Sequence, residues 1–507
     1  MPDFAFDNTY ARELPGLYVS WRPATVPAPR LLFLNRPLAE ELGLPLAALE
    51  GPGGAALLAG NSVPEGAEPL AQAYAGHQFG GFSPQLGDGR ALLLGELIDA
   101  QGHRRDIAFK GSGRTPFARG GDGKAAIGPM LREVILGEAM HALGIPTTRA
   151  LAVAATGEPV YRERPLPGAV LTRVAASHLR VGTFQYYASR GEIDRLRQLA
   201  DYTIARHDAT LVGQPDRYLS LLRAVADRQA TLIARWMNVG FIHGVMNTDN
   251  MAISGETIDY GPCAFMEAFD PRAVFSSIDH GGRYAYANQP PIAQWNLARL
   301  AEALLPLIAD GDSEAATQRA IEQATEVLSG FAANHEAAMR QGRRAKLGLH
   351  HATAANDDTD DALVNDWLAE LHRQQVDFTL AWRRLGDAAS GNEAPLLSLF
   401  AEPQPLEAWL QHWRTRCAAD DAAASTNEPD AAATRAERMR LVNPFVIPRN
   451  HRVEEALSAA SDDDDLGPFE RLLAAVRSPF DETPEKAPYG EPAPAAVTAC
   501  YRTFCGT

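Results

Sequence analysis

The densest group of side chains that could do chemistry lies between residues 243 and 261. His243, Asp249 and Asn250 share one polar loop, and Asp259 follows nine residues after Asn250. Carboxylate and amide oxygens are hard ligands of the kind that Mg²⁺ prefers, and a Mg²⁺ ion held by one or two such side chains commonly binds phosphate as well. This segment therefore predicts a site for a metal ion and a phosphate-bearing ligand.

The spacing of this loop resembles the catalytic loop of protein kinases, H-R-D-L-x-x-x-N, which is followed by D-F-G. The interval from His243 to Asn250 is the same, and Asp259-Tyr260-Gly261 stands in the place of D-F-G. Kinases keep their catalytic Asp at the third position of the loop, whereas this chain has Val245 there and an Asp at 249. The pattern indicates a kinase-like nucleotide site with a relocated acid, in which Asn250 and Asp259 hold the metal.

The first candidate for phosphate binding is the string Gly87-Asp88-Gly89-Arg90, which precedes an apolar run. Glycine lets backbone N–H groups approach an anion closely, and an adjacent arginine adds a forked contact. An Asp-Gly pair is also the commonest signal of an ordinary hairpin turn, so both interpretations stay open.

Lys110 is the second candidate, because it ends an apolar strand. The string Ile107-Ala108-Phe109-Lys110 is similar to the V-A-I-K strand of kinases, whose lysine contacts nucleotide phosphates and a helix glutamate. A strand-end lysine can also simply reach to water. The next helix carries two glutamates that could meet this lysine. Glu138 falls within the apolar stripe of the helix, and Glu133 points to nearly the opposite side. Periodicity does not decide which of them meets Lys110.

Arg173 and Arg180 form the third candidate. Two arginines seven positions apart share a face if the segment is helical, and together they could bind a polyphosphate. The alternative is a pair of unrelated surface arginines.

Composition excludes several classes of protein. The 507 residues include 47 Lys and Arg against 63 Asp and Glu, a formal charge of −16, which argues against general binding of nucleic acid or of anionic membrane surfaces. No window is apolar enough to span a bilayer, the N-terminus does not read as a secretory signal, and four cysteines do not make a disulfide scaffold. The expectation is a soluble, cytoplasmic globular protein with about three domains' worth of chain.

The elements that must position these residues change character along the chain. Residues 1–65 predict irregular structure and short helices packed over a core, and a β-rich part precedes a helical part that begins near residue 190. Strands are expected over Ala91–Ile98 and 107–110 as a hairpin, and over 151–153, 160 and 169–174. Helices are expected over 129–143, 195–210, 218–239, 292–308, 314–341 and 361–385. Mobile surface segments or linkers are expected at 418–436, 461–465 and 478–495.

Long strings of this sequence resemble one family. They are Tyr74–Gly80, Leu86–Arg90, Lys110–Phe117, Leu143–Arg149, His243–Asn250, Asp259–Cys263 and the terminal Phe504–Thr507. On these strings, which occur in order over nearly the full chain, the sequence is similar to the selenoprotein O family, also called YdiU, whose members are kinase-like protein adenylyltransferases.

The resemblance implies an α+β, kinase-like bilobal fold with a β-rich N-lobe and a helical C-lobe. The implied parts are an N-terminal extension packed on the core (1–65), the N-lobe (66–190), the C-lobe with the catalytic and metal-binding loops (191–310), and a helical C-terminal region with mobile segments and a redox-capable tail (311–507).

The resemblance also implies roles for site residues. ATP would contact Gly87, Gly89, Arg90, Lys110, Asp122, Gly123, Arg173, Arg180 and Asp259, and Lys110 would pair with Glu133. ATP would be flipped relative to kinases, so that Lys110, Arg173 and Arg180 contact its β- and γ-phosphates and its α-phosphate faces the acceptor. Asp249 would accept the proton of a Ser, Thr or Tyr hydroxyl of a protein substrate, and pyrophosphate would leave. Asn250 and Asp259 would hold Mg²⁺, with Mn²⁺ as the alternative.

Three rival functions stay open. They are Mn²⁺-dependent transfer of UMP, ordinary transfer of the γ-phosphate, and ATP binding without catalysis. Val245 in the usual base position argues against an ordinary kinase, and the full set of Lys110, Asp249, Asn250 and Asp259 argues against a non-catalytic scaffold.

The cysteines suggest redox sensitivity. In relatives, the position of Cys505 is selenocysteine or cysteine and can bridge to the loop position of Cys263, so the resemblance implies a disulfide between a mobile tail and the active site. A persistent disulfide is disfavoured in reducing cytosol, and Cys500 is a competing partner.

Overall fold

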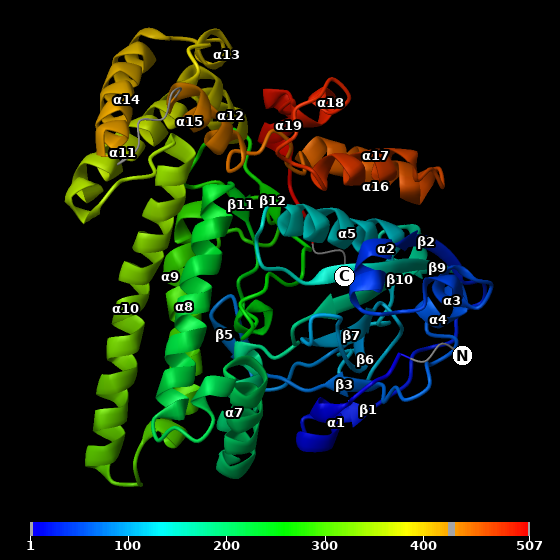
Figure 1. Cartoon of the computed structure of the whole chain (residues 1–507). Helices are drawn as coiled ribbons and strands as arrows, with labels where there is room; N and C mark the ends of the chain where they lie inside the picture. The colour runs from blue at the N-terminus through cyan, green and yellow to red at the C-terminus, as the bar shows by residue number, and fades with distance from the viewer. Residues whose placement is uncertain (1–3, 424–430, 505–507) are drawn as a thin grey trace.

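The computed structural model describes residues 4–423 and 431–504, which form an antiparallel sheet beside a large group of helices (Figure 1). The strands are β1 (Tyr18–Ser20), β2 (Arg30–Leu34), β3 (Leu70–Gln72), β4 (Gly76–Gln78), β5 (Gly81–Ser83), β6 (Ala91–Ile98), β7 (Arg104–Lys110), β8 (Ala125–Ala126), β9 (Arg149–Tyr161), β10 (Pro165–Ala175), β11 (Phe241–Ile242) and β12 (Ala264–Phe265). The helices are α1 (Thr9–Glu13), α2 (Arg36–Glu41), α3 (Leu46–Glu50), α4 (Gly54–Leu58), α5 (Ile127–Ala142), α6 (Val181–Ala188), α7 (Ile193–His207), α8 (Arg217–Asn238), α9 (Gln289–Ile308), α10 (Glu314–Leu347), α11 (Asp357–Gln374), α12 (Phe378–Ala389), α13 (Ala394–Leu397), α14 (Gln404–Ala423), α15 (Ala431–Arg440), α16 (Asn450–Asp462), α17 (Gly467–Val476), α18 (Ala487–Gly490) and α19 (Ala495–Cys500). The expected α+β class is confirmed.

The main sheet has the strand order β1-β3-β6-β7-β10-β9-β2, and β8 pairs with β10. The predicted hairpin of β6 and β7 is present, and the carboxylate of Asp99 in its turn accepts the N–H groups of Gln101 and His103. In the register of the sheet, Lys110 lies opposite Ala91 of β6 and Leu171 of β10. Lys110 is therefore carried by a central strand that is fixed on both sides.

The segment 4–65 contributes more to the sheet than the sequence predicts. Helices α2 to α4 pack an apolar cluster against the sheet, which agrees with short helices over a core. However, β1 and β2 are the two edge strands of that same sheet, so residue 65 is not a boundary of the sheet. These strands have three and five residues and lie beside prolines, and such short edge strands leave little pattern in a sequence.

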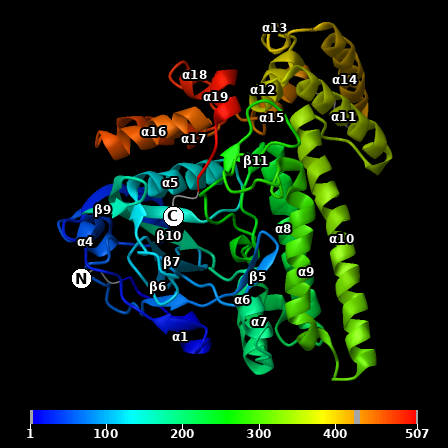
Figure 2. The ribbon, with the colours of Figure 1, turned by 180° about the vertical axis from the view of Figure 1, so that it is seen from behind.

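Helix α5 is covered on both sides. It lies across the sheet, and α16 and α17 pack against it from the other side in two opposite views (Figures 1 and 2). Because both of its faces are buried, its glutamates Glu133 and Glu138 are buried too. Glu138 pairs with Arg149 of β9 and with Arg477 just after α17.

Two predicted elements have different bounds. Residues 151–153 and 160, expected in separate strands, belong to the single strand β9. The helix expected over 361–385 is divided into α11 and α12, because Gln375 adopts a left-handed conformation (φ 54°) and Asp377 then caps α12 by accepting the N–H of Leu380. Within the described residues, no helix is both long and apolar enough to cross a membrane.

Segments expected to be mobile are tied to the fold where the structure describes them. Asp462, the last residue of α16, pairs with Arg164, and Asp464, just after the helix, pairs with Arg30. In the segment 478–495, the Pro479 carbonyl accepts the N–H groups of Phe445 and Val446. Of the expected segment 418–436, the described parts belong to α14 and α15, and residues 424–430 lie outside the described residues.

Candidate active site

A cavity of about 1330 Å³ brings the predicted site residues together. Its walls come from the strands β6, β7 and β10, from α5 and α16, from the loops between 245 and 262, and from the tail at 500–504. The lining includes Gly87, Gly89, Arg90, Lys110, Asp122, Gly123, Glu133, Arg173, Arg180, Asp249, Asn250 and Asp259. Predicted site residues separated by up to 172 positions therefore face one space.

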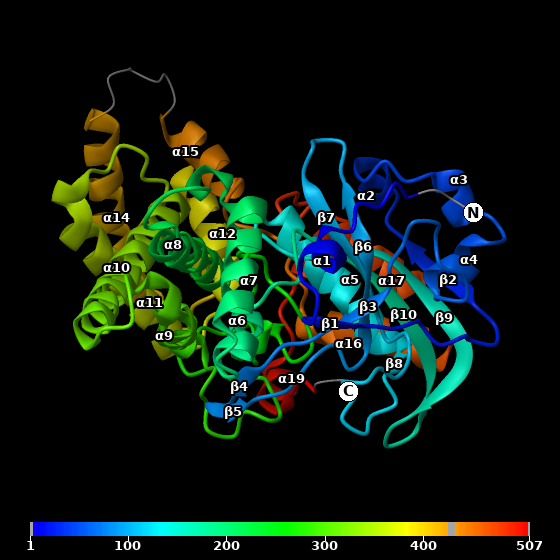
Figure 3. The same ribbon diagram turned by 90° about the horizontal axis from the view of Figure 1, so that it is seen from below.

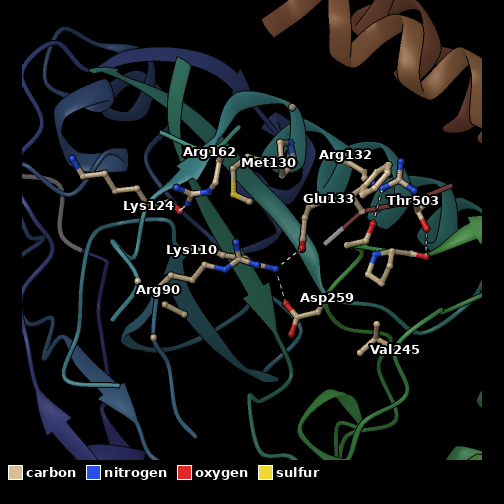
Figure 4. A pocket seen from close by; sticks show the side chains of 18 of the residues that line it. Arg90, Lys110, Lys124, Met130, Arg132, Glu133, Arg162, Val245, Asp259 and Thr503 are labelled. Carbon is tan, nitrogen blue, oxygen red and sulfur yellow. Dashed lines mark hydrogen bonds and ion pairs between the residues drawn. The ribbon is translucent and has the colours of Figure 1, made fainter. Parts of the chain in front are cut away.

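A chain of ion pairs runs through the centre of this cavity (Figure 4). Lys110 Nζ lies 2.5 Å from Glu133 Oε1 and 2.6 Å from Asp259 Oδ1, and it is almost fully buried. Of the two glutamates that helical periodicity left open, Glu133 is thus the one that contacts Lys110. Arg173 also donates to Asp259 Oδ1, at 2.7 Å.

Asp259 is held in an unusual backbone conformation. Its φ of 64° is left-handed, which is uncommon for a residue other than glycine and is typically found where the surroundings enforce it. Burial alone would raise the pKa of its carboxyl, but the Lys110 ammonium and the Arg173 guanidinium overcome that effect and hold the pKa well below its usual range. Asp259 is therefore an anion at any working pH.

Arg173 and Arg180 come from two elements and not from one helix. Arg173 lies in β10, whereas Arg180 is the N-cap residue of α6, and both side chains are buried. Arg173 Nε lies 3.2 Å from His178 Nε2, and His178 Nδ1 lies 2.9 Å from Asp106. Although the segment is not helical, its two guanidinium groups line the same cavity.

Asp249 lies in a short 3-10 turn (Thr248–Asn250) at the wall of the cavity. Gln78 Nε2 donates to its Oδ2 at 3.0 Å, while its Oδ1 is buried and has no hydrogen-bond partner among the described residues. Burial raises the pKa of this carboxyl to about 6, and the Gln78 hydrogen bond opposes part of that rise. Such a group can accept a proton near neutral pH.

The oxygen atoms near Asp249 suit a divalent cation. Asn250 Nδ2 donates to the Val245 carbonyl, which leaves the amide oxygen of Asn250 available. Lys110 and Arg173 both contact Asp259 through the same carboxylate oxygen, Oδ1. Within the described part of the chain, no group of three or more His, Cys, Asp or Glu residues could hold a metal by itself. Two hard oxygen ligands therefore fit Mg²⁺, which usually completes its shell with water and phosphate, and do not suit a metal that needs an all-protein cage.

Two of the predicted glycines are required by close packing. Gly87 has a φ of 138°, and a Cβ there would overlap the Phe117 ring; Gly123 has a φ of 68°, and a Cβ there would overlap the Gly113 carbonyl. Directly before Gly123, Asp122 pairs with Arg162 at 2.8 Å, and this contact lowers the pKa of the Asp122 carboxyl. The glycine positions thus form one wall of the cavity.

Comparisons with known proteins agree on one family. Residues 3–477 match the family model described as "Protein adenylyltransferase SelO". The chain is 60% identical over 505 residues to the protein nucleotidyltransferase YdiU of Cereibacter sphaeroides strain KD131, covering 99% of this chain and 100% of that protein. It is 60% identical to YdiU of Chromobacterium violaceum, covering 97% and 100%. This chain belongs to the SelO family of protein adenylyltransferases.

Two polar residues of this SelO-family site were not identified as such from the sequence. Gln78 contacts Asp249, and His178 contacts Arg173. Gln78 lies in the string Tyr74–Gly80 that helps to carry the family resemblance, but nothing in the residue types of that string points to a partner 171 positions away. His178 lies between the two arginines, and no spacing rule singles it out.

The implied disulfide stays a prediction, because Cys505 lies outside the described residues. Cys263 is fully buried, which raises the pKa of its thiol to about 11. The described end of the tail is fixed nearby, since Thr503 donates from Oγ1 to the Pro262 carbonyl at 2.7 Å and its backbone bonds to Phe275 and Ser277.

Proposed function

We propose that this chain transfers AMP from ATP to Ser, Thr or Tyr hydroxyls of protein substrates and releases pyrophosphate. The observation that carries the proposal is the state of Asp249, a buried carboxylate at the cavity wall, with Oδ2 held by Gln78 and Oδ1 buried without a hydrogen-bond partner among the described residues. A group of this kind accepts a proton from a hydroxyl when a substrate brings the hydroxyl to it. We further propose the kinase-like bilobal arrangement, with residues 66–190 and the edge strands β1 and β2 in one lobe and residues 191–310 in the other.

Buried cations support a flipped nucleotide. Lys110, Arg173 and Arg180 line the inner part of the cavity, and their fixed positive charges suit the β- and γ-phosphates, which carry most of the charge of ATP. The α-phosphate would then face Asp249. The acceptor hydroxyl loses its proton to Asp249 as its oxygen bonds to the α-phosphorus, and the bond from that phosphorus to the bridging oxygen of pyrophosphate breaks.

Asn250 and Asp259 would hold Mg²⁺ or Mn²⁺. When bound, the ion neutralises the negative charge that develops on the phosphate oxygens during transfer. Lys110 and Arg173 keep Asp259 ionised, so its carboxylate is ready to act as a ligand.

The deciding experiment uses ATP labelled at either the α- or the γ-phosphate. Each is incubated with the purified protein, Mg²⁺ and a cell extract, and then repeated with Mn²⁺. Label retained on protein from the α-position alone supports AMP transfer, whereas label from the γ-position alone makes the chain a kinase and refutes the flipped nucleotide. Label from α-labelled UTP in preference to ATP would make UMP the transferred group, and no label under any condition would favour a non-catalytic role.

A variant of Asp259 tests the metal site. Asp259→Ala should abolish α-label incorporation, because the metal loses its anionic ligand and both Lys110 and Arg173 lose one carboxylate partner. Asp270→Ala, which removes a surface carboxylate near Arg272, should keep the wild-type rate. Near-normal incorporation by Asp259→Ala would refute the assignment.

A further inference from the structure

The hairpin of β4 and β5 stands at the rim of the cavity, apart from the main sheet and near α6 (Figure 3). Its turn carries Phe79, and the loop before Tyr284 carries Ile278; both line the cavity. Their side chains are nevertheless 40% and 46% exposed. Ligand sites are lined mainly by apolar and aromatic side chains, so these two residues can contact a group that enters the cavity.

The hairpin is fixed to the loop that carries Asp249. His77 donates its N–H to Thr248 Oγ1 at 2.7 Å, Gln78 donates to Asp249, and Phe79 donates its N–H to Asn247 Oδ1 at 3.1 Å. Three consecutive residues of the hairpin thus hold three consecutive residues of the loop. A substrate group that contacts Phe79 is therefore held in a fixed position relative to Asp249, the proposed proton acceptor.

Phe79 is kept outward at the cost of an unfavourable conformation. Its φ of 52° is left-handed, a conformation that bulky residues rarely adopt unless the surroundings enforce it. The Phe79 ring packs against one side of Tyr284, with centroids 5.2 Å apart. Enforced backbone conformations of this kind are concentrated at functional sites.

A cation lies beside this hairpin. A Cβ on Gly80 would be 3.7 Å from the Arg283 guanidinium carbon, and that carbon is 4.9 Å from the centre of the Trp295 ring. No carboxylate of the described residues pairs with Arg283, and its Nε is buried with no hydrogen-bond partner in the same set. Its charge is therefore available to an anionic group of a ligand.

We propose that Phe79, Ile278 and Arg283 form an acceptor ledge that receives the hydroxyl-bearing segment of the protein substrate. The segment lies extended across the rim, with a large apolar side chain on Phe79 and Ile278 and a carboxylate side chain at Arg283. The hydroxyl between them reaches Asp249. This inference rests on the proposed function, since it names what that site accepts.

The test uses a positional-scanning peptide library with Ser, Thr or Tyr at the centre and α-labelled ATP. Wild-type protein should label peptides with a large apolar residue and an Asp or Glu flanking the hydroxyl about tenfold faster than the library average. Phe79→Asn removes the ring while keeping a residue that tolerates φ near 52°, and it should lose the apolar preference. Arg283→Glu should exchange the acidic preference for a basic one.

Matched controls lie on surfaces away from the cavity. Leu441→Asn removes an exposed apolar side chain, and Arg319→Glu reverses an exposed charge on α10; both should keep the wild-type preferences. Equal ATP affinity and equal thermal unfolding of all variants exclude general damage. If both ledge variants keep the wild-type preferences, or if wild type labels peptides without any flank preference, the ledge is refuted. If wild type labels neither peptides nor extract proteins from the α-position, the proposed function itself fails.

Discussion

At the scale of single residues, the proposed chemistry depends on how Asp249 is held. Its carboxylate is buried, which raises its pKa to about 6, and the amide of Gln78 is the one side chain of the described residues that donates to it. An amide donor stabilises the ionised form more than the protonated form. Gln78 is therefore a positioning residue that also sets the pH range in which Asp249 can accept a proton.

Gln78→Leu should move the acid limb of the transfer rate to higher pH. In wild type the rate should fall as pH decreases through about 6, where Asp249 takes up a proton, or lower if bound metal favours the anion. Loss of a hydrogen bond to a charged group, about 1.5–3 kcal/mol, corresponds to an upward shift of about one to two pH units. The measurement is kcat for α-label transfer between pH 4.5 and 9.

Gln198→Leu is the matched control, since Gln198 donates to a surface carbonyl far from the cavity. It should leave the pH profile unchanged. An unshifted acid limb in Gln78→Leu, with the same rate at pH 8 as wild type, would contradict the role assigned to Gln78.

At the scale of elements, local patterns were readable and long-range contacts were not. The β6–β7 hairpin and the helix α5 follow from apolar runs and turn residues within a few positions of one another. Which glutamate of α5 meets Lys110 depends on α16 and α17 covering the far side of α5, more than 300 residues later in the chain. Arg173 and Arg180 meet because a strand ends and a helix begins between them, whereas spacing alone left open whether they share a helix face or are unrelated surface arginines.

The first turn of α6 requires a glycine. Gly182 accepts the Ala75 N–H through its carbonyl, and a Cβ at Gly182 would overlap the Ala75 carbonyl oxygen. Gly182→Ala should therefore push α6 away from the segment that leads into β4, lower the free energy of unfolding by about 1–3 kcal/mol, and slow transfer by displacing Gln78. Urea unfolding and α-label rates measure both effects.

Gly53→Ala serves as the control for that substitution, because a Cβ there meets open space and its φ is negative. It should change neither stability nor rate appreciably. Wild-type stability and rate in Gly182→Ala would show that α6 can shift without disturbing the site.

At the scale of the whole molecule, the C-terminal region is joined to the segment that follows Asp259. Arg449 is fully buried and pairs with Glu267 at 2.7 Å and with Asp377 at 2.6 Å, and it also donates to the Gly490 carbonyl. Asn450 donates to the Phe265 carbonyl of β12. These contacts connect segments spread over more than 220 positions, so the later helices support the loop that carries Asp259 and do not fold beside it independently.

Arg449→Met should destabilise the protein by about 3–5 kcal/mol, because two buried carboxylates lose their counter-ion while the volume of the side chain is kept. The loss of stability should be largest at neutral pH and should become smaller as pH falls toward 4, since protonation of Glu267 and Asp377 removes their unpaired charges. Urea unfolding at pH 7 and pH 5 measures this loss of stability.

Arg373→Met is the control, because it removes a surface arginine that also pairs with two carboxylates. It should shift the unfolding midpoint far less because solvent screens exposed pairs. Equal shifts of the unfolding midpoint in the two variants would mean that Arg449, paired with Glu267 and Asp377, contributes no more to stability than a surface ion pair does.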